Sequence, residues 1–316
     1  MLEVAGLVLP LFSLVLLGFV AGKRIGLPVE ALGWLNVFIV YVALPPLFFK
    51  LLSTTPVEEF ANGAFLLATT GTTFLVFCSC VIVALLLRRG LRIATVQGFA
   101  GAYGNIGYLG PPLAIAAFGP AAGVPVALVF CVDNAMHFTF APLLMALGGG
   151  EGAERPKLLP LLGGILKKIF THPFIIATLV GVAAAFTGFR PAAPIQTIID
   201  TLANAAAPCA LFAMGVTAAI RPLKRIPLEL AWLIPVKLVV HPLLMYAVVS
   251  RVPGIEPLWL HAAVLLAALP SATNVFVIAQ QYGVWEERAS SAVVISTLLS
   301  IASVTGWLYA MKIGLI

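Results

Sequence analysis

The sequence predicts an all-α polytopic membrane protein, and three observations support that fold class. The first is composition, because 61% of the 316 residues are hydrophobic and only 9% are charged, whereas an average soluble domain has about 25% charged residues. The second is a series of apolar segments of about 20 residues, the length that a helix needs to cross a bilayer. The third is the gathering of Lys and Arg in alternate loops.

The apolar segments predict ten transmembrane helices. They cover residues 4–22, 31–52, 63–87, 93–118, 121–147, 171–188, 194–219, 226–249, 257–281 and 285–311. Alternate loops are rich in basic residues, namely Lys23, Arg24, Arg88, Arg89, Arg92, Arg155, Lys157, Lys167, Lys168, Arg221, Lys224, Arg225 and Arg288. The other loops hold only Lys50, Arg190, Arg251 and Lys312. By the positive-inside rule the first set is cytoplasmic and both termini lie outside, and the unbroken alternation supports the count of ten.

One long hydrophilic connection, residues 148–170, divides the ten segments five and five. The chain is therefore expected to consist of a first repeat at residues 1–147, a cytoplasmic linker and a second repeat at residues 171–316. Five spans in each half reverse the direction of insertion, so the repeat is expected to be inverted. Faint similarity between ALPPLF at residues 43–48 and APCALF at residues 207–212 fits this arrangement.

The fourth segment contains a stretch, AYGNIGYLGPP at residues 102–112, that a continuous helix disfavours. Each glycine costs about 1 kcal/mol relative to alanine in a helix, and Pro112 removes a backbone hydrogen bond. The helix is therefore expected to break at membrane depth, with its second half beginning near Pro111 and Pro112. The freed backbone groups must be buried in protein or line a wet cavity, because hydrocarbon does not tolerate them.

The ninth segment repeats the break at LPSATN, residues 269–274. Its second half is expected to begin after Pro270, where the hydroxyl groups of Ser271 and Thr273 can cap the helix. The fourth segment runs outward and the ninth inward, so their two new helix N-termini would approach the midplane from opposite directions. Both would offer N–H donors and partial positive charge to one point, which is a predicted anion site. Matched breaks in two halves are typical of transporters.

Residues at the two breaks make up the predicted substrate site. Asn105 and Asn274 can each donate and accept a hydrogen bond there. The predicted substrate-binding residues are Gly104, Asn105, Gly107, Pro111, Pro270, Ser271, Thr273 and Asn274. The alternative, that both asparagines only cap the broken backbone, stays open at this point.

Ionisable side chains at membrane depth form a predicted coupling-ion site. Asp133 and His137 share one face of the fifth segment, and Lys237 and His241 repeat the spacing in the eighth. Charged groups are costly at this depth and indicate function by default. The first pair could relay a proton, hold a sodium ion or serve only helix packing. Lys237 could pair with Asp133, attract an anionic substrate or reach toward the interface.

The sequence also separates the function classes. No GxSxG, HExxH or paired-aspartate motif supports an enzyme. The cysteines match no metal-binding spacing, so a metal ion is left unknown, and the expected cofactor is at most a coupling proton or sodium ion. A channel needs a continuous polar pore, so the matched breaks favour a carrier, and an anion channel or facilitative uniporter stays open as the alternative.

Four groups of motifs run along nearly the whole chain: LNVF and VALP at residues 35–38 and 42–45, GNIGYLGPPL at 104–113, NAAAPCALFAMG at 204–215, and ALPS at 268–271. Together they resemble the auxin efflux carrier family in its bacterial branch, which includes malonate transporters. The resemblance implies an inverted repeat of ten helices with crossing helices 4 and 9, and scaffold and transport domains each drawn from both repeats. It also implies transport of an organic anion by an elevator-like motion. Plant members commonly have proline at the first crossing, where this chain has Gly104.

The expected substrate is a small organic anion such as a dicarboxylate or an indole carboxylate, and the expected location is the cytoplasmic membrane. The lipid bilayer is the other expected partner, and a homodimer is left open. The net charge of +6 does not indicate nucleic acid, because the basic residues lie in short clusters between apolar spans. The sequence does not determine the substrate, the direction of transport or the coupling ion.

Overall fold

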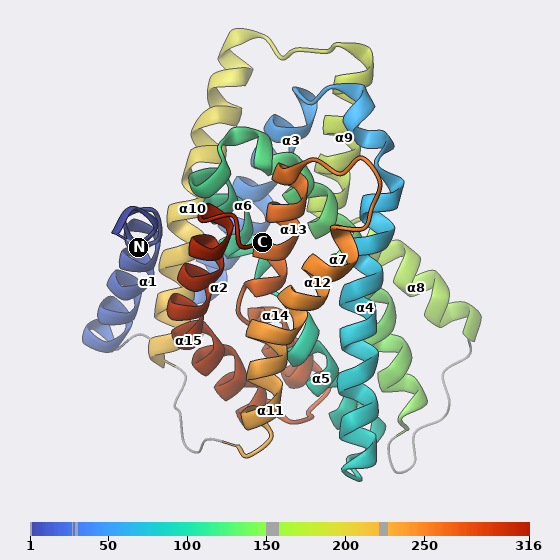
Figure 1. Ribbon diagram of the computed structural model, residues 1–316. Helices are drawn as coiled ribbons and strands as arrows, with labels where there is room; N and C mark the ends of the chain where they lie inside the picture. Colours follow the sequence, from blue (N-terminus) through green and yellow to red (C-terminus); the bar gives the residue numbers. More distant parts are fainter. Residues whose placement is uncertain (1, 27, 29–30, 150–157, 221–226) are drawn as a thin grey trace.

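The computed structural model describes residues 2–26, 28, 31–149, 158–220 and 227–316. Within these ranges the chain is helical, and β-type pairing occurs only as one isolated antiparallel bridge, between Gly104 and Ser271. Residues 150–157 of the predicted linker and the predicted basic loop at 221–226 lie outside the described residues. Figure 1 shows the helices gathered into one bundle, with most of them running along its long axis.

The helices follow the predicted segments closely. Their bounds are α1 Leu2–Ile25, α2 Leu32–Val37, η2 Phe38–Ala43, α3 Leu44–Ser53, η3 Val57–Ala61, α4 Gly63–Leu86, α5 Leu91–Ala102, α6 Ile106–Phe118, η4 Pro120–Ala122, α7 Gly123–Leu147, α8 Leu158–Phe170, α9 Pro173–Thr187, α10 Ala193–Ile220, α11 Leu230–Pro235, η5 Val236–Val240, α12 His241–Val249, α13 Pro257–Ala268, α14 Thr273–Gln281 and α15 Glu286–Lys312. Each of the ten predicted segments overlaps at least one of these helices.

Seven helical stretches among the described residues are long and apolar enough to cross a membrane. They are Val8–Ile25, Leu32–Ser53, Val57–Leu86, Pro120–Leu147, Ala193–Ile220, Leu230–Val249 and Glu286–Lys312. Three shorter apolar helices accompany them, at Ile106–Phe118, Pro173–Thr187 and Pro257–Ala268. The all-α, multi-pass class is therefore confirmed, whereas the count of ten spans and the inverted repeat stay predictions.

Two of the long stretches contain a π-helical turn, at η2 and at η5. Each turn is followed at once by a helix with proline in its first positions, Pro45 in α3 and Pro242 in α12. Proline has no N–H to bond the preceding turn, so the wider π turn lets the helix continue past it. The turn η5 carries Lys237 into the bundle, where that side chain is fully buried.

Part of the predicted linker forms a helix, α8, that the sequence analysis did not identify. Its apolar side chains Leu159, Leu162, Leu166 and Phe170 are exposed. A short helix with an apolar exposed face and basic residues such as Lys167 is typical of a helix that lies in the membrane interface. The helix contacts α7 and α9, so it adjoins the bundle.

Small residues bring helices α1 and α10 into backbone contact, at the left of Figure 1. A Cβ atom on Gly18 would lie 2.1 Å from the carbonyl oxygen of Phe212, and one on Gly215 would lie 1.9 Å from that of Val15. Larger side chains at either position would force the helices apart. Close contact through small residues is a usual way for helices to associate in a membrane, where the hydrophobic effect does not drive it.

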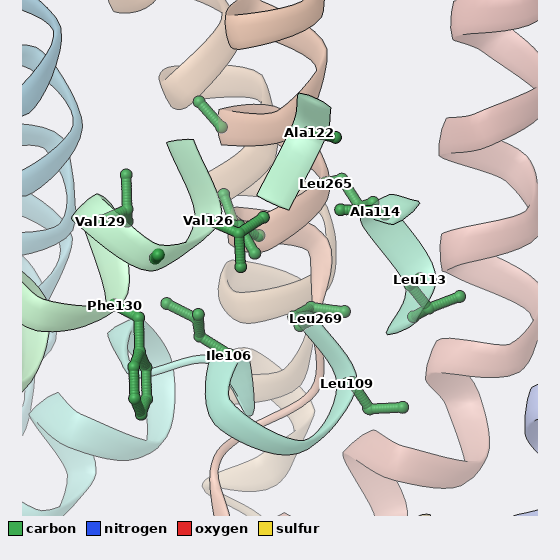
Figure 2. Packing of buried hydrophobic residues seen from close by; sticks show 14 of the residues in the cluster. Ile106, Leu109, Leu113, Ala114, Ala122, Val126, Val129, Phe130, Leu265 and Leu269 are labelled. Atoms are coloured by element: carbon green, nitrogen blue, oxygen red, sulfur yellow. The ribbon is translucent and has the colours of Figure 1, made fainter. Parts of the chain in front are cut away.

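The buried apolar side chains form two clusters that meet at the broken helices. One cluster gathers α6, the first half of α7 and α13, and Figure 2 shows Ile106, Phe130 and Leu265 within it. The other gathers α4, α5, α11 and α14, and includes Phe99 and Tyr103. The polar backbone between Tyr103 and Ile106 therefore passes from one apolar cluster to the other, and its hydrogen bonds must be made inside the protein.

Candidate functional site

The two predicted breaks lie against each other and satisfy each other's backbone. Helix α5 ends at Ala102 and α6 begins at Ile106, while α13 ends at Ala268 and α14 begins at Thr273. The N–H of Asn105 donates to the carbonyl of Pro270 at 2.8 Å, and the N–H of Ala272 donates to the carbonyl of Tyr103 at 2.9 Å. Two breaks that would each leave unpaired groups in an apolar interior thus form one hydrogen-bonded junction.

The junction has no room for a side chain at position 104, so it requires Gly104. A Cβ atom on Gly104 would lie 2.9 Å from the carbonyl oxygen of Leu266, which is backbone and cannot move aside. A Cβ atom on Gly107 would likewise lie 3.0 Å from ring carbons of Phe130. These two glycines of the predicted substrate site therefore allow close packing of the broken helices.

The expectation that the second half of the fourth segment begins near Pro111 and Pro112 is wrong. Helix α6 begins at Ile106 and runs through both prolines. The missing N–H groups leave two carbonyls of the first turn without their usual partners, a loss that helices packed inside a membrane protein accommodate. The break at Pro270 is confirmed, because that residue lies between α13 and α14.

Polar groups cap the carbonyl ends of the two first halves. The hydroxyl of Ser271 donates to the carbonyl of Ala100 at 2.6 Å, near the end of α5, and the N–H of Ser271 donates to the hydroxyl of Ser296 at 3.1 Å. At the end of α13 the ammonium of Lys237 donates to the carbonyl of Ala267. The last carbonyls of a helix lack partners within it, so one break is capped by neutral serine and the other by a cation.

The two predicted asparagines point to different places. The amide of Asn105 donates to the sulfur of Met214 on α10 at 3.0 Å. The amide of Asn274 lies 3.5 Å from the hydroxyl of Tyr103, which itself donates to Asn134 at 2.6 Å. Asn105 and Asn274 therefore do not meet at one point, and neither forms a side-chain cap on its own helix.

A wide cavity lies where the end of α5 meets the start of α14. It offers about 180 Å³ to the centre of a water-sized sphere. Its polar lining consists of Tyr103, Asn134, His137, His172, Asn274, Gln281 and Tyr282. The ring of His137 stacks on that of Tyr103 with centroids 3.4 Å apart. The lining thus combines neutral hydrogen-bonding groups with aromatic faces.

A second, closed cavity lies where the end of α13 meets the start of α6, and it offers only about 10 Å³. Asp133, Thr69, Thr73 and His241 line it, together with Gly104 and Ala267. Asp133 is 1% exposed, and its Oδ1 atom has no hydrogen-bond partner. A buried carboxylate oxygen without a partner is costly, which makes Asp133 a candidate functional residue.

Lys237 has no exposed surface and lies beside the closed cavity, in contact with His241 and Ala267 of its lining. Its ammonium lies 3.4 Å from Nδ1 of His241, whose Nε2 lies 3.5 Å from the hydroxyl of Thr73. Lysine has no acceptor, so Nδ1 accepts and Nε2 carries the hydrogen of His241. Lys237 and Asp133 form no ion pair in the described part of the chain.

The structure divides the predicted coupling-ion residues between the two cavities. Asp133 and His241 line the closed cavity and Lys237 lies beside it in contact with His241, whereas His137, one turn further along α7, lines the wide one. The sequence analysis did not identify Tyr103 or the lining role of Thr69 and Thr73. Tyr103 could have been found from its place directly before Gly104, because a residue at the end of a broken helix faces the gap.

A family profile and several known proteins match the chain. The profile of the membrane transport protein family matches residues 4–308. A "Putative malonate transporter" of Rhizobium meliloti is 57% identical over 99% of this chain and 98% of the relative. An "Uncharacterized transporter" of Methanothermobacter thermautotrophicus is 28% identical over 95% of this chain and 96% of that protein. "Auxin efflux carrier component 6" of Arabidopsis thaliana is 27% identical over 55% of this chain and 35% of that protein.

Proposed function

Because the chain belongs to the membrane transport protein family, the auxin efflux carrier family that its motifs resemble, we propose that it is a secondary carrier of a small organic anion. Family membership makes it a membrane transporter and not an enzyme. A dicarboxylate is the proposed substrate class, since the relative that is 57% identical along the whole chain has malonate in its name. The proposal places the carrier in the cytoplasmic membrane and covers either direction of transport, uptake or export.

The observation that carries the proposal is the junction of the two breaks. It leaves α6 and α14, of 13 and nine residues, beginning inside the protein without side-chain caps. Free N–H groups and the helix dipole make such ends favourable for an anion. The start of α14 opens on the wide cavity at Asn274, so a substrate carboxylate is proposed to sit there, beside Tyr103 and Asn134.

The other predicted substrate residues take supporting parts in this proposal. Thr273 has a buried hydroxyl without a partner at the first position of α14, and it can turn toward the anion. Asn105 would contact the substrate only after its bond to Met214 opens. Gly104, Pro270 and Ser271 hold the junction through close packing and main-chain bonds, and Gly107 and Pro111 shape the first two turns of α6.

The proposed architecture is an inverted repeat of ten spans, with both termini outside and the broken spans 4 and 9 crossing at the junction. The alternation of basic loops supports this topology. The backbone device also occurs twice, in α5 with α6 and in α13 with α14. The proposed movement is elevator-like, with the junction travelling as one body against α1 and α10.

The proposed coupling site is the closed cavity, where Asp133 is the carboxylate and His241 and Lys237 are its polar neighbours. An ionisable group at this depth is typical of proton and ion pathways in transporters. The closed cavity is separated from the wide one by α7, which contributes Asp133 to the first and Asn134 to the second. The coupling ion and the substrate would therefore bind on opposite sides of α7 and influence each other through that helix, without direct contact.

Uptake by proteoliposomes containing the full-length chain tests the function. Radiolabelled malonate is the probe, with succinate and indole acetate as competitors. We expect saturable uptake that an excess of dicarboxylate suppresses, and counterflow when the vesicles are preloaded with malonate. Flux that does not saturate and is accompanied by ionic current would instead indicate a channel. Uptake equal to that of protein-free vesicles for every carboxylate would contradict the proposal.

A further inference from the structure

The position of Lys237 suggests a role that an ordinary structural lysine would not have. The residue lies in the π turn η5, has no exposed surface, and donates its ammonium to the carbonyl of Ala267. That carbonyl belongs to the last turn of α13, where the helix dipole presents partial negative charge. A cation at a helix C-terminus in a closed interior is strongly held.

The ammonium lies beside a cavity whose lining suits a small cation. Two of its three donors meet Ala267 and His241, which both line that cavity. Asp133 also lines the cavity and has an unpartnered carboxylate oxygen there. The hydroxyl hydrogen of Thr69 is used on the carbonyl of Phe65 at 2.9 Å, so its lone pairs are free as well. Carboxylate, hydroxyl and carbonyl oxygens are the ligands that hard cations prefer.

The corresponding place in the other half of the junction holds no charge. There the end of α5 is capped by the hydroxyl of Ser271, which is backed by Ser296. The closed cavity has room for about one water molecule beside the ammonium, since a single water needs roughly 10–15 Å³ on this measure. A second cation next to Lys237 would therefore lack charge balance, because Asp133 is the one carboxylate among the residues that line this cavity.

We propose that the ammonium of Lys237 is a tethered cation that takes the place of a sodium ion in the closed cavity, so that the carrier binds and uses no sodium. The proposal rests on the function proposed above, in which Asp133 provides the coupling carboxylate. It decides between the two coupling ions that the sequence leaves open. It also assigns the Ala267 carbonyl oxygen and Nδ1 of His241 as the atoms that hold this cation, with Asp133 as the carboxylate of the adjoining cavity.

Thermal unfolding of the purified full-length chain in sodium chloride and in choline chloride, at equal ionic strength, tests this assignment. The wild-type melting temperature should be the same in both salts. Lys237→Met keeps most of the side-chain length and removes the terminal nitrogen, so sodium can enter. Its melting temperature should rise by about 2 °C or more in sodium, because a ligand that binds only the folded chain stabilises it. Lys50→Met, which removes an exposed lysine, is the matched control and should show no sodium response.

Lys237→Gln replaces Lys237→Met if the latter folds poorly, because its amide keeps a donor for the carbonyl of Ala267 without the charge. Lys237→Met with Asp133→Asn removes both buried charges, which proteins tolerate better than the loss of one. This double variant should fold and show no sodium response, which assigns the response of the single variant to Asp133. Stabilisation of the wild type by sodium would overturn the proposal, as would the absence of a sodium response in the folded Lys237 variants that retain Asp133.

The readout separates this inference from the proposed function. Melting temperatures in the two salts need no substrate, so they report on the cation site even if no carboxylate is transported. In proteoliposomes, wild-type malonate uptake should stay within about twofold when choline replaces external sodium. A roughly tenfold loss of uptake in choline would overturn the tethered cation and leave the carrier function standing.

Discussion

The wide and the closed cavities are built from the same backbone parts and differ in their side chains. Each lies where the carboxyl end of one half-helix meets the amino end of another: α5 with α14 in the wide cavity, and α13 with α6 in the closed one. The wide cavity offers about 180 Å³ and polar, aromatic groups, whereas the closed one offers about 10 Å³, with the carboxylate of Asp133 in its lining and the ammonium of Lys237 beside it.

The difference shows how the same pairing of half-helix ends can form both a substrate site and a coupling-ion site. A site that must accept and release a hydrated anion benefits from neutral donors, which do not hold the ligand too firmly. Charges act most strongly where water is excluded, because the low dielectric does not screen them. Asp133 accordingly lines the smaller cavity and Lys237 lies beside it, and four variants can test this division of tasks.

The largest expected effect is the loss of transport in Asp133→Asn. The variant removes the only carboxylate that lines the closed cavity and leaves the wide cavity intact. Malonate uptake should fall to below about a tenth of the wild-type rate, because the group that carries the coupling ion is removed. Malonate binding, followed by isothermal titration, should weaken by less than about threefold. Normal uptake with an unchanged pH profile would show that Asp133 serves only packing.

A second prediction compares the asparagines at the two breaks. Asn274→Ala should weaken malonate binding by about tenfold to a hundredfold, because a hydrogen bond to a charged group contributes roughly 1.5–3 kcal/mol. Asn105→Ala should weaken it by less than about threefold, since the Asn105 amide is bonded to Met214. Asn62→Ala, in the loop before α4, is the control. Equal losses in Asn105→Ala and Asn274→Ala would return the anion to a site between the breaks.

The third prediction concerns the junction that separates the cavities. Gly104→Ala places a methyl group 2.9 Å from the carbonyl oxygen of Leu266, so the free energy of unfolding should fall by about 1–3 kcal/mol. Gly71→Ala in α4 meets nothing within 4 Å and should be neutral or slightly stabilising. Thermal unfolding in detergent measures both. Equal stability of the two variants would show that the junction is looser than its contacts imply.

The smallest expected effect lies outside both cavities and sets the baseline for pH experiments. At the start of α11, burial acts to raise the pKa of Glu229, but bonds from its own N–H, Trp285 and Arg288 outweigh burial, so the pKa lies below 4.5. A lowered folded-state pKa contributes stability above the ordinary value, and that stability is lost as pH falls below about 4.5. Glu229→Gln should cost about 1 kcal/mol at pH 7 and almost nothing at pH 3. Melting temperatures at the two pH values measure this, and an equal cost at both would contradict it.

Much of the fold could be predicted because it follows from local chemistry. Long apolar runs predict helices, and all ten predicted segments contain them. The break at Pro270 was predicted because proline disfavours the helical conformation in the residue before it. Helix α6 passes through Pro111 and Pro112, by contrast, because neighbouring helices decide whether a proline ends a membrane helix, and a single sequence does not contain that information.

The candidate site was harder to predict because its contacts join distant parts of the chain. Asn105 was predicted to meet Asn274, yet its amide donates to Met214 on another helix. Lys237 was considered as a partner of Asp133, a surface anchor or an attraction for substrate, and its actual partner is a carbonyl freed by the break at the end of α13. Such a partner exists only once the break is formed, so residue spacing within one segment does not reveal it.

The hydrogen-bonded junction also constrains how the protein is made. The N–H of Asn105 and the carbonyl of Tyr103 are bonded to Pro270 and Ala272. Both partners belong to the ninth segment, so the ribosome makes them long after the fourth. Until then the first half must sit in the membrane with polar backbone groups exposed at depth, where each unsatisfied group costs several kcal/mol. The first five segments alone should therefore insert poorly, and the chain should stay incompletely folded until its ninth segment has been synthesised.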